Sequence, residues 1–145
     1  MSRRPLILVA DDSEDIRNLF GIMLKSKYDV RFAIDSNEAL AGADTEPLPD
    51  LILLDIEMPH LDGYEVCARL KANPALAHIP VIFVTGRTDA ATRIQCLAMG
   101  AAGFVVKPFH ARDVLSQVRQ ALERPDLDEA ADDRVAASPV MAICP

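Results

Sequence analysis

Three carboxylates in this sequence come at the ends of short apolar runs. Asp11 and Asp12 follow the run 6–10, and Asp55 follows the run 51–54. If these runs are neighbouring strands, about 4.8 Å apart, the three side chains crowd one edge. Two unit charges about 5 Å apart repel by roughly 3 kcal/mol at an effective dielectric near 20. The pattern therefore predicts a cation among them, and oxygen ligands favour Mg²⁺ or Mn²⁺ over zinc.

Two further apolar runs end in residues that can contact a phosphoryl group. Thr85 and Gly86 follow the run 81–84, and Lys107 follows the run 104–106. A hydroxyl, an unhindered backbone N–H and an ammonium can together neutralise phosphoryl oxygens beside a carboxylate–metal centre. In that setting Asp55 is the nucleophile and forms an acyl phosphate. Each residue alone is ordinary turn chemistry, so the prediction depends on their meeting at one edge.

The elements that position these residues alternate between two periods. Continuous apolar runs predict buried strands, and apolar residues spaced three and four apart predict helices. Strands are expected at 6–10, 28–33, 51–54, 81–84 and 104–106, and helices from Ser13 to Leu24, over 36–43, 64–72 and 90–99, and from Val114 to Pro125. In the fourth helix Ala91, Ile94 and Leu97 are expected to face inward.

Five strand-then-helix units predict an α/β fold. We expect a (βα)5 doubly wound, five-stranded parallel sheet of flavodoxin-like order 2-1-3-4-5. Ligands in that order bind beyond the carboxyl ends of strands 1 and 3, where Asp11, Asp12 and Asp55 lie.

Length and composition limit the class of protein. The 145 residues suit one domain, with a net charge of −7 that disfavours direct binding to nucleic acid. No apolar run approaches the roughly 18 residues of a membrane span. The apolar stretch near the N-terminus is too short for the core of a signal peptide. We therefore expect a cytoplasmic protein without a membrane contact. Cys67, Cys96 and Cys144 form no C-x-x-C pair, which disfavours zinc. Residues 1–125 are expected to form the domain, and 126–145 an acidic flexible tail or linker.

Five segments resemble the receiver domain of bacterial two-component response regulators, including the chemotaxis regulators. The similarity covers residues 5–124 and matches both identity and spacing at 7–13, 50–59, 61–65, 79–86 and 99–109.

That resemblance implies a role for each acidic residue. Asp55 would be the phosphoacceptor, Asp12 a direct ligand of Mg²⁺, and Asp11 a ligand largely through water. The backbone carbonyl of Glu57 would be the third protein ligand. Whether the Glu57 side chain faces the phosphoryl site or solvent stays open.

The resemblance also implies a switch. Thr85 and Lys107 would contact the phosphoryl oxygens, Gly86 would add its backbone N–H, and Phe104 would be the aromatic switch residue. The Lys107–Pro108 bond is expected to be cis.

The implied partners are a sensor histidine kinase or a histidine phosphotransfer protein. The helix 90–99, the strand 104–106 and the last helix would contact a downstream protein or a second copy. Such a protein catalyses only its own phosphorylation and dephosphorylation, so it is not an enzyme in the usual sense.

Three alternatives bear on this interpretation. The chain is favoured as a free-standing receiver, with the N-terminal receiver of a longer regulator, such as a cyclic-dinucleotide enzyme, as the alternative. A haloacid-dehalogenase-type phosphatase also uses a strand-end Asp nucleophile, but it needs a second Asp where Glu57 stands. A flavodoxin-like cofactor carrier is rejected because the acidic residues 11–15 would repel a phosphate.

Overall fold

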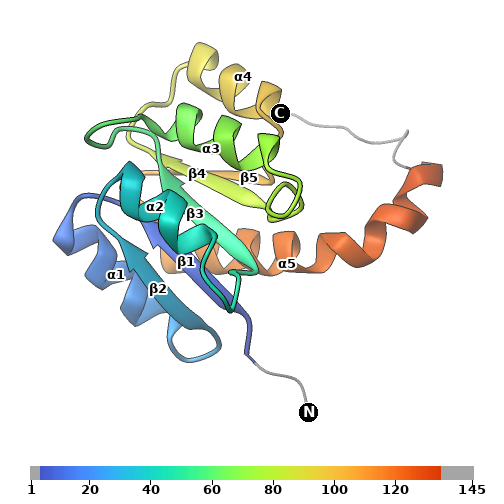
Figure 1. The fold of residues 1–145 in the computed structure, drawn as a ribbon, viewed down its shortest axis with the longest axis horizontal. Coiled ribbons are helices and arrows are strands. Elements are labelled where there is room, and N and C mark those ends of the chain that lie inside the picture. Colours follow the sequence, from blue (N-terminus) through green and yellow to red (C-terminus); the bar gives the residue numbers. More distant parts are fainter. Residues whose placement is uncertain (1–3, 135–145) are drawn as a thin grey trace.

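The computed structural model describes residues 4–134 and contains one parallel sheet between two layers of helices (Figure 1). The strands lie in the order β2-β1-β3-β4-β5 and pair in parallel throughout, which confirms the predicted fold and order. The elements are β1 (Leu6–Ala10), α1 (Glu14–Leu24), β2 (Asp29–Ala33), α2 (Ser36–Ala43), β3 (Leu51–Asp55), α3 (Gly63–Ala72), β4 (Val81–Thr85), α4 (Ala90–Ala98), β5 (Gly103–Val106) and α5 (Ala111–Arg134).

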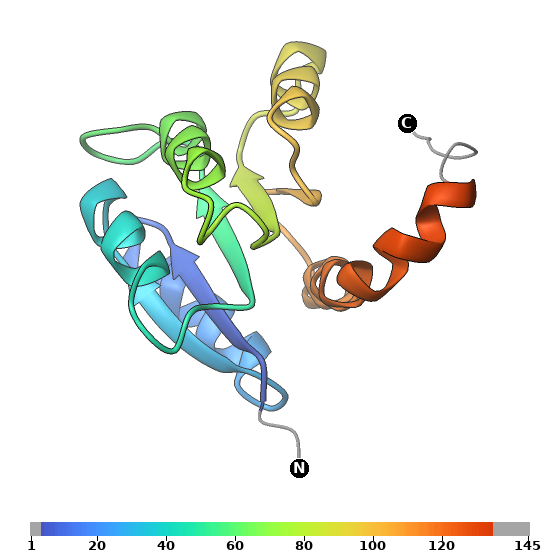
Figure 2. The same cartoon turned by 45° about the vertical axis from the view of Figure 1, so that its right-hand side comes forward.

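Both faces of the sheet are buried, which explains the continuous apolar runs of its central strands. Successive side chains of a strand point to opposite faces. In β1, Leu8 joins the core beneath α2, α3 and α4, whereas Ile7 and Val9 join the core beneath α1 and α5. Figures 1 and 2 show these two helical layers on either side of the strands.

Three helices begin close to the predicted positions, and each has a side-chain cap at its N-terminus. The Ser13 side chain accepts a hydrogen bond from the backbone N–H of Ile16 and thereby caps the start of α1. Asp62 and Glu65 form a reciprocal capping box at the start of α3. The second helix begins at Ser36, with Asp35 as its cap.

The predicted inward face of the fourth helix is wrong. Ile94 and Leu97 of α4 are 64% and 66% exposed, and Ala91 is also exposed. Thr92 and Cys96 are the buried pair instead. They lie one turn apart, so they share a face of α4 that packs toward α3.

The predicted end of the last helix at Pro125 is also wrong, because α5 continues to Arg134. Proline removes one backbone hydrogen bond, yet its φ fits a helix, and a bend is the common result. Figure 2 shows the last part of α5 turned away from the direction of its first part. Of the predicted tail, residues 126–134 are therefore helical, and residues 135–145 lie outside the described part of the chain.

Candidate functional site

The carboxyl edge of the sheet carries the predicted site residues. Asp55 and Thr85 are the last residues of β3 and β4, and Asp11 and Lys107 come directly after β1 and β5. Because β1, β3, β4 and β5 are consecutive in the sheet, the four side chains project from one edge.

Asp11, Asp12 and Asp55 form the acidic cluster that the sequence predicts. One carboxylate oxygen from each lies within 4.8 Å of the others. Asp11 and Asp55 are buried, at 1% and 4% exposure, whereas Asp12 is exposed. Asp11 Oδ1 accepts a hydrogen bond from the backbone N–H of Ser13 at 2.9 Å. Asp11 Oδ2 is buried without a hydrogen bond.

Lys107 supplies the positive charge inside this cluster. Its Nζ lies 3.1 Å from Asp11 Oδ2, as an ion pair without hydrogen-bond geometry, and 3.4 Å from Asp55 Oδ1. Burial alone would lower the pKa of Lys107. The charges of Asp55 and Asp11 outweigh burial and raise that pKa above its ordinary value, so the ammonium stays protonated.

The pKa of Asp55 is raised by its position in the cluster. Burial, followed by the negative charge of Asp11, raises the pKa of Asp55 from 3.8 to about 7, even though Lys107 acts in the opposite direction. When all three carboxylates are ionised, the single ammonium of Lys107 leaves the cluster with a net charge of −2.

This donor set fits a divalent cation. The oxygens are hard ligands, the buried Asp11 Oδ2 accepts no hydrogen bond, and neither His nor Cys joins the group among the described residues. The cluster can therefore hold Mg²⁺ or Mn²⁺, and Asp11, Asp12 and Asp55 are the carboxylates that would bind it.

Glu57 approaches the cluster through its backbone. Its N–H donates a hydrogen bond to the Asp55 carboxylate, and its side chain is exposed. Exposure does not distinguish the phosphoryl site from bulk solvent, because Asp12 of the cluster is also exposed, so the orientation of that side chain stays a prediction. The role of the Glu57 carbonyl as a metal ligand stays a prediction.

Thr85 and Gly86 border the cluster on the side of β4. Thr85 is 2% exposed, and its hydroxyl oxygen accepts a hydrogen bond from the backbone N–H of Arg87 at 3.0 Å. Its hydroxyl hydrogen is thereby directed away from Arg87. Nothing lies within 4 Å of the position where a side chain on Gly86 would begin, so the backbone at Gly86 is unhindered.

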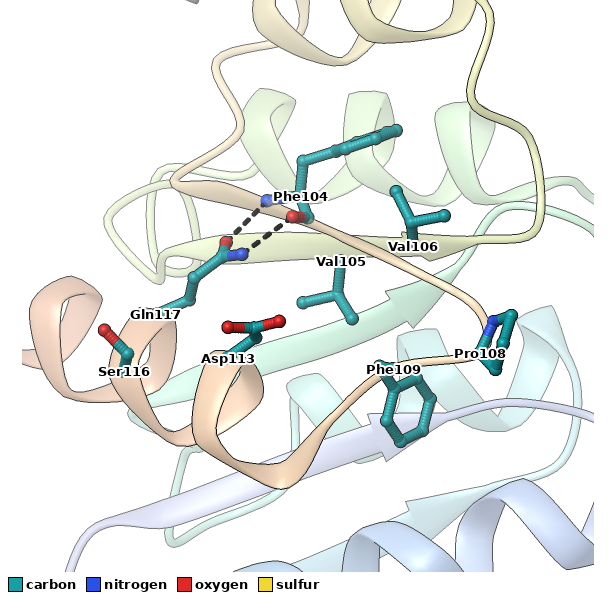
Figure 3. Close-up of a pocket in the computed structure, with 8 residues that line it drawn as sticks. All are labelled: Phe104, Val105, Val106, Pro108, Phe109, Asp113, Ser116 and Gln117. Atoms are coloured by element: carbon teal, nitrogen blue, oxygen red, sulfur yellow. Dashed lines mark hydrogen bonds between the residues drawn. The ribbon is translucent and has the colours of Figure 1, made fainter.

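Phe104 lies three residues before Lys107 on the outermost strand. Its ring is half-buried against the core beneath α3 and α4, and the guanidinium carbon of Arg93 lies 5.7 Å from the ring centre. The Lys107–Pro108 bond is cis, as expected. Sequence reasoning missed Gln117, whose side chain binds the backbone of Phe104 (Figure 3). A polar residue on an amphipathic helix carries no sequence signal for such a contact.

Comparison with known proteins agrees with this geometry. The model of the response regulator receiver domain family matches residues 7–119. The chain belongs to this family. Receiver domains act in two-component signalling, where they interact with histidine kinases and downstream effectors, and they bind Mg²⁺ through acidic residues.

Curated relatives of this receiver are longer than the chain. Response regulator PleD of Caulobacter vibrioides is 42% identical over 114 residues, which are 78% of this chain and 25% of PleD. The alkaline phosphatase synthesis transcriptional regulatory protein PhoP of Bacillus subtilis is 39% identical over 122 residues, 83% of this chain and 50% of PhoP. The receiver thus spans a quarter to a half of these relatives.

Solved structures share the fold of this receiver. A response regulator from Chloroflexus aurantiacus superposes with a TM-score of 0.80 and 28% identity, covering 84% of this chain and all of that one. The chemotaxis protein CheY4 of Vibrio cholerae gives a TM-score of 0.76 and 29% identity, covering 82% and 99%. None of the helices between residues 4 and 134 has the length and apolar character needed to cross a membrane.

Proposed function

We propose that this receiver accepts a phosphoryl group on Asp55 from a phosphohistidine and transmits the change through a protein-contact surface. The ion-paired cluster of Asp11, Asp55 and Lys107 is the observation that supports this most directly. The Asp55 carboxylate, the nucleophile of this proposal, lies 3.4 Å from the Lys107 ammonium at the edge where this fold binds ligands.

In the reaction, a carboxylate oxygen of Asp55 attacks phosphorus. An acyl phosphate O–P bond forms, the P–N bond of the donor breaks, and the imidazole nitrogen takes the electron pair. The attacking carboxylate must be ionised. Its raised pKa of about 7 leaves a substantial protonated fraction at neutral pH in the protein alone.

Asp11, Asp12 and Asp55 would hold Mg²⁺, which would supply positive charge to the attacking carboxylate and to the transferring phosphoryl oxygens. Lys107 lies 3.4 Å from Asp55 and is held protonated, so its ammonium stabilises a phosphoryl oxygen attached there. The Thr85 hydroxyl and the Gly86 N–H are the further donors in this proposal.

The output surface in our proposal is the α4–β5–α5 face. Ile94 and Leu97 support it, because two large apolar side chains exposed on one face of α4 favour a protein contact. The net charge of −7 favours a protein partner over direct contact with nucleic acid. The receiver would catalyse only its own phosphorylation and dephosphorylation, free-standing or as the N-terminal part of a longer regulator.

Labelling with a small phosphodonor tests the proposal. Acetyl phosphate with Mg²⁺ should add one phosphoryl mass to the native protein and to the control Asp44→Asn, whose aspartate is exposed at the end of α2. Asp55→Asn should remain unlabelled, and hydroxylamine should release the label because it is an acyl phosphate. A label of equal intensity in Asp55→Asn would exclude Asp55 as the acceptor. Sustained turnover of p-nitrophenyl phosphate would indicate a phosphatase instead.

A further inference from the structure

A side chain covers the outer edge of β5, the side on which β5 has no neighbouring strand. β5 is the last strand of the sheet. The backbone N–H of Lys107 donates a hydrogen bond to the backbone carbonyl of Thr85 in β4. Because successive residues of a strand direct their backbone groups to opposite sides, the N–H and C=O of Phe104 point away from β4. Unpaired strand edges invite pairing with other chains, and proteins usually block them.

Gln117 of α5 makes the two hydrogen bonds that a neighbouring strand would make. Its Oε1 accepts from the Phe104 N–H, and its Nε2 donates to the Phe104 carbonyl, both at 2.8 Å (Figure 3). The side-chain amide therefore satisfies both backbone groups of one residue.

Gly103 makes room for this contact. A Cβ at residue 103 would overlap Gln117 Oε1 and would lie 3.2 Å from Ile82 Cγ1. Gly103 has an ordinary φ, so the absence of a side chain is needed for the approach of Gln117 and not for a special backbone conformation. We call Gly103, Phe104 and Gln117 the β5 clamp.

The clamped residue is also held by its ring. Arg93 of α4 lies 5.7 Å from the centre of the Phe104 ring, which packs half-buried on the core beneath α3 and α4. Phe104 thus connects two helices, with its ring beside α4 and its backbone bonded to α5. Beside the clamp, Asp113 and Ser116 line a groove along β5, so α5 does not pack closely along the whole strand (Figure 3).

We propose that Gln117 is a positioning residue for the switch. It holds the Phe104 backbone on α5. When Asp55 is phosphorylated and Thr85 moves, the displacement therefore passes to the Phe104 ring and α4, while β5 stays in place. The role rests on the proposed function. Without the clamp, part of the displacement would be absorbed by movement of β5, and less would reach α4.

Amide hydrogen exchange tests the clamp in the unmodified protein. Gln117→Met keeps the length of the side chain but removes both polar groups. We expect exchange of the Phe104 amide to accelerate at least tenfold, while the amide of Val105, which faces β4, changes less than twofold. Gly103→Ala should give the same pattern from the strand side. Gln120→Met is the control, because Gln120 is exposed on α5 and its amide donates a hydrogen bond to Ser116 Oγ at 3.3 Å. Unchanged exchange at Phe104 in Gln117→Met would overturn the clamp.

A phosphoryl mimic then tests the positioning role. Beryllofluoride with Mg²⁺ should saturate Gln117→Met and Gln120→Met at the same concentration within twofold, as followed by the amide signal of Asp55. The shift changes of α4 amides on saturation should fall by at least half in Gln117→Met and persist in Gln120→Met. Equal α4 responses in the two variants would show that Gln117 only stabilises the fold. If even the native protein gives no response, the proposed function fails, and the exchange experiment still decides whether the clamp exists.

Discussion

Replacing Asp55 with asparagine should remove a pH dependence of stability that the acidic cluster imposes. The folded protein raises the pKa of Asp55 from 3.8 to about 7, chiefly through burial and then through Asp11. Between these two values the folded state binds more protons than the unfolded state. The free energy of unfolding therefore falls as the pH rises through this window.

The expected size follows from the same two pKa values. Linkage gives a loss of roughly 2 to 3 kcal/mol between pH 5 and pH 8 from Asp55 alone. In Asp55→Asn this contribution disappears, while Lys107 keeps its partner Asp11 at 3.1 Å. The variant therefore leaves the partly buried Lys107 ammonium with an ion-pair partner.

Urea unfolding at pH 5, 6, 7 and 8 in the presence of a chelator measures the effect. The relevant quantity is the change in unfolding free energy with pH, native minus variant, because the other titrating groups then cancel. Asp44→Asn, an exposed aspartate at the end of α2, should keep the native slope. Parallel pH profiles for the native protein and Asp55→Asn would refute the raised pKa and the electrostatic argument built on it.

Saturating Mg²⁺ should raise the thermal midpoint of the native protein, since an ion bound only to the folded state adds about 2.7 kcal/mol at one hundred times its dissociation constant. Asp12→Asn should blunt that rise and leave the melting of the metal-free protein equal or higher; an unaltered metal response would remove Asp12 from the ligand set. Gly63→Ala should destabilise by about 2 kcal/mol or more in urea unfolding, because its Cβ would lie 2.5 Å from the Asp55 carbonyl oxygen and 2.8 Å from Ile56 Cα, both backbone atoms. Phe104→Ala should still accept label on Asp55 from acetyl phosphate but lose the beryllofluoride response of α4, and a full α4 response would contradict the switch role.

The acidic cluster was readable from the sequence because position along the chain and position in the sheet are directly linked. Buried strands appear as continuous apolar runs, and parallel strands bring their carboxyl ends to one edge. Asp11, Asp12 and Asp55 could therefore be placed together before any distance was known, and the structure confirms that their oxygens meet within 4.8 Å. The individual ligand and phosphoryl roles of these residues remain predictions.

The orientation of α4 could not be read in the same way. Its apolar residues Ile94 and Leu97 suggest an inward stripe, but Thr92 and Cys96 are the buried pair. The hydroxyl of Tyr64 on α3 lies within hydrogen-bond reach of both. The Thr92 hydroxyl also donates a hydrogen bond to Asp89 Oδ1 at 2.9 Å, so a threonine can be buried here, and the hydrophobicity pattern of α4 does not reveal these hydrogen bonds.

Patterns repeated along each element were enough to predict the fold class and the edge at which the acidic residues gather, and the strand order was predicted as the common one for five strand-then-helix units. The contacts of Lys107 with Asp11 and Asp55, and of Gln117 with the backbone of Phe104, became visible only in the folded structure. Each of these contacts depends on distances of about 3 Å between groups far apart in the chain. Such distances are set by how the helices pack on the sheet, and local sequence patterns do not encode them.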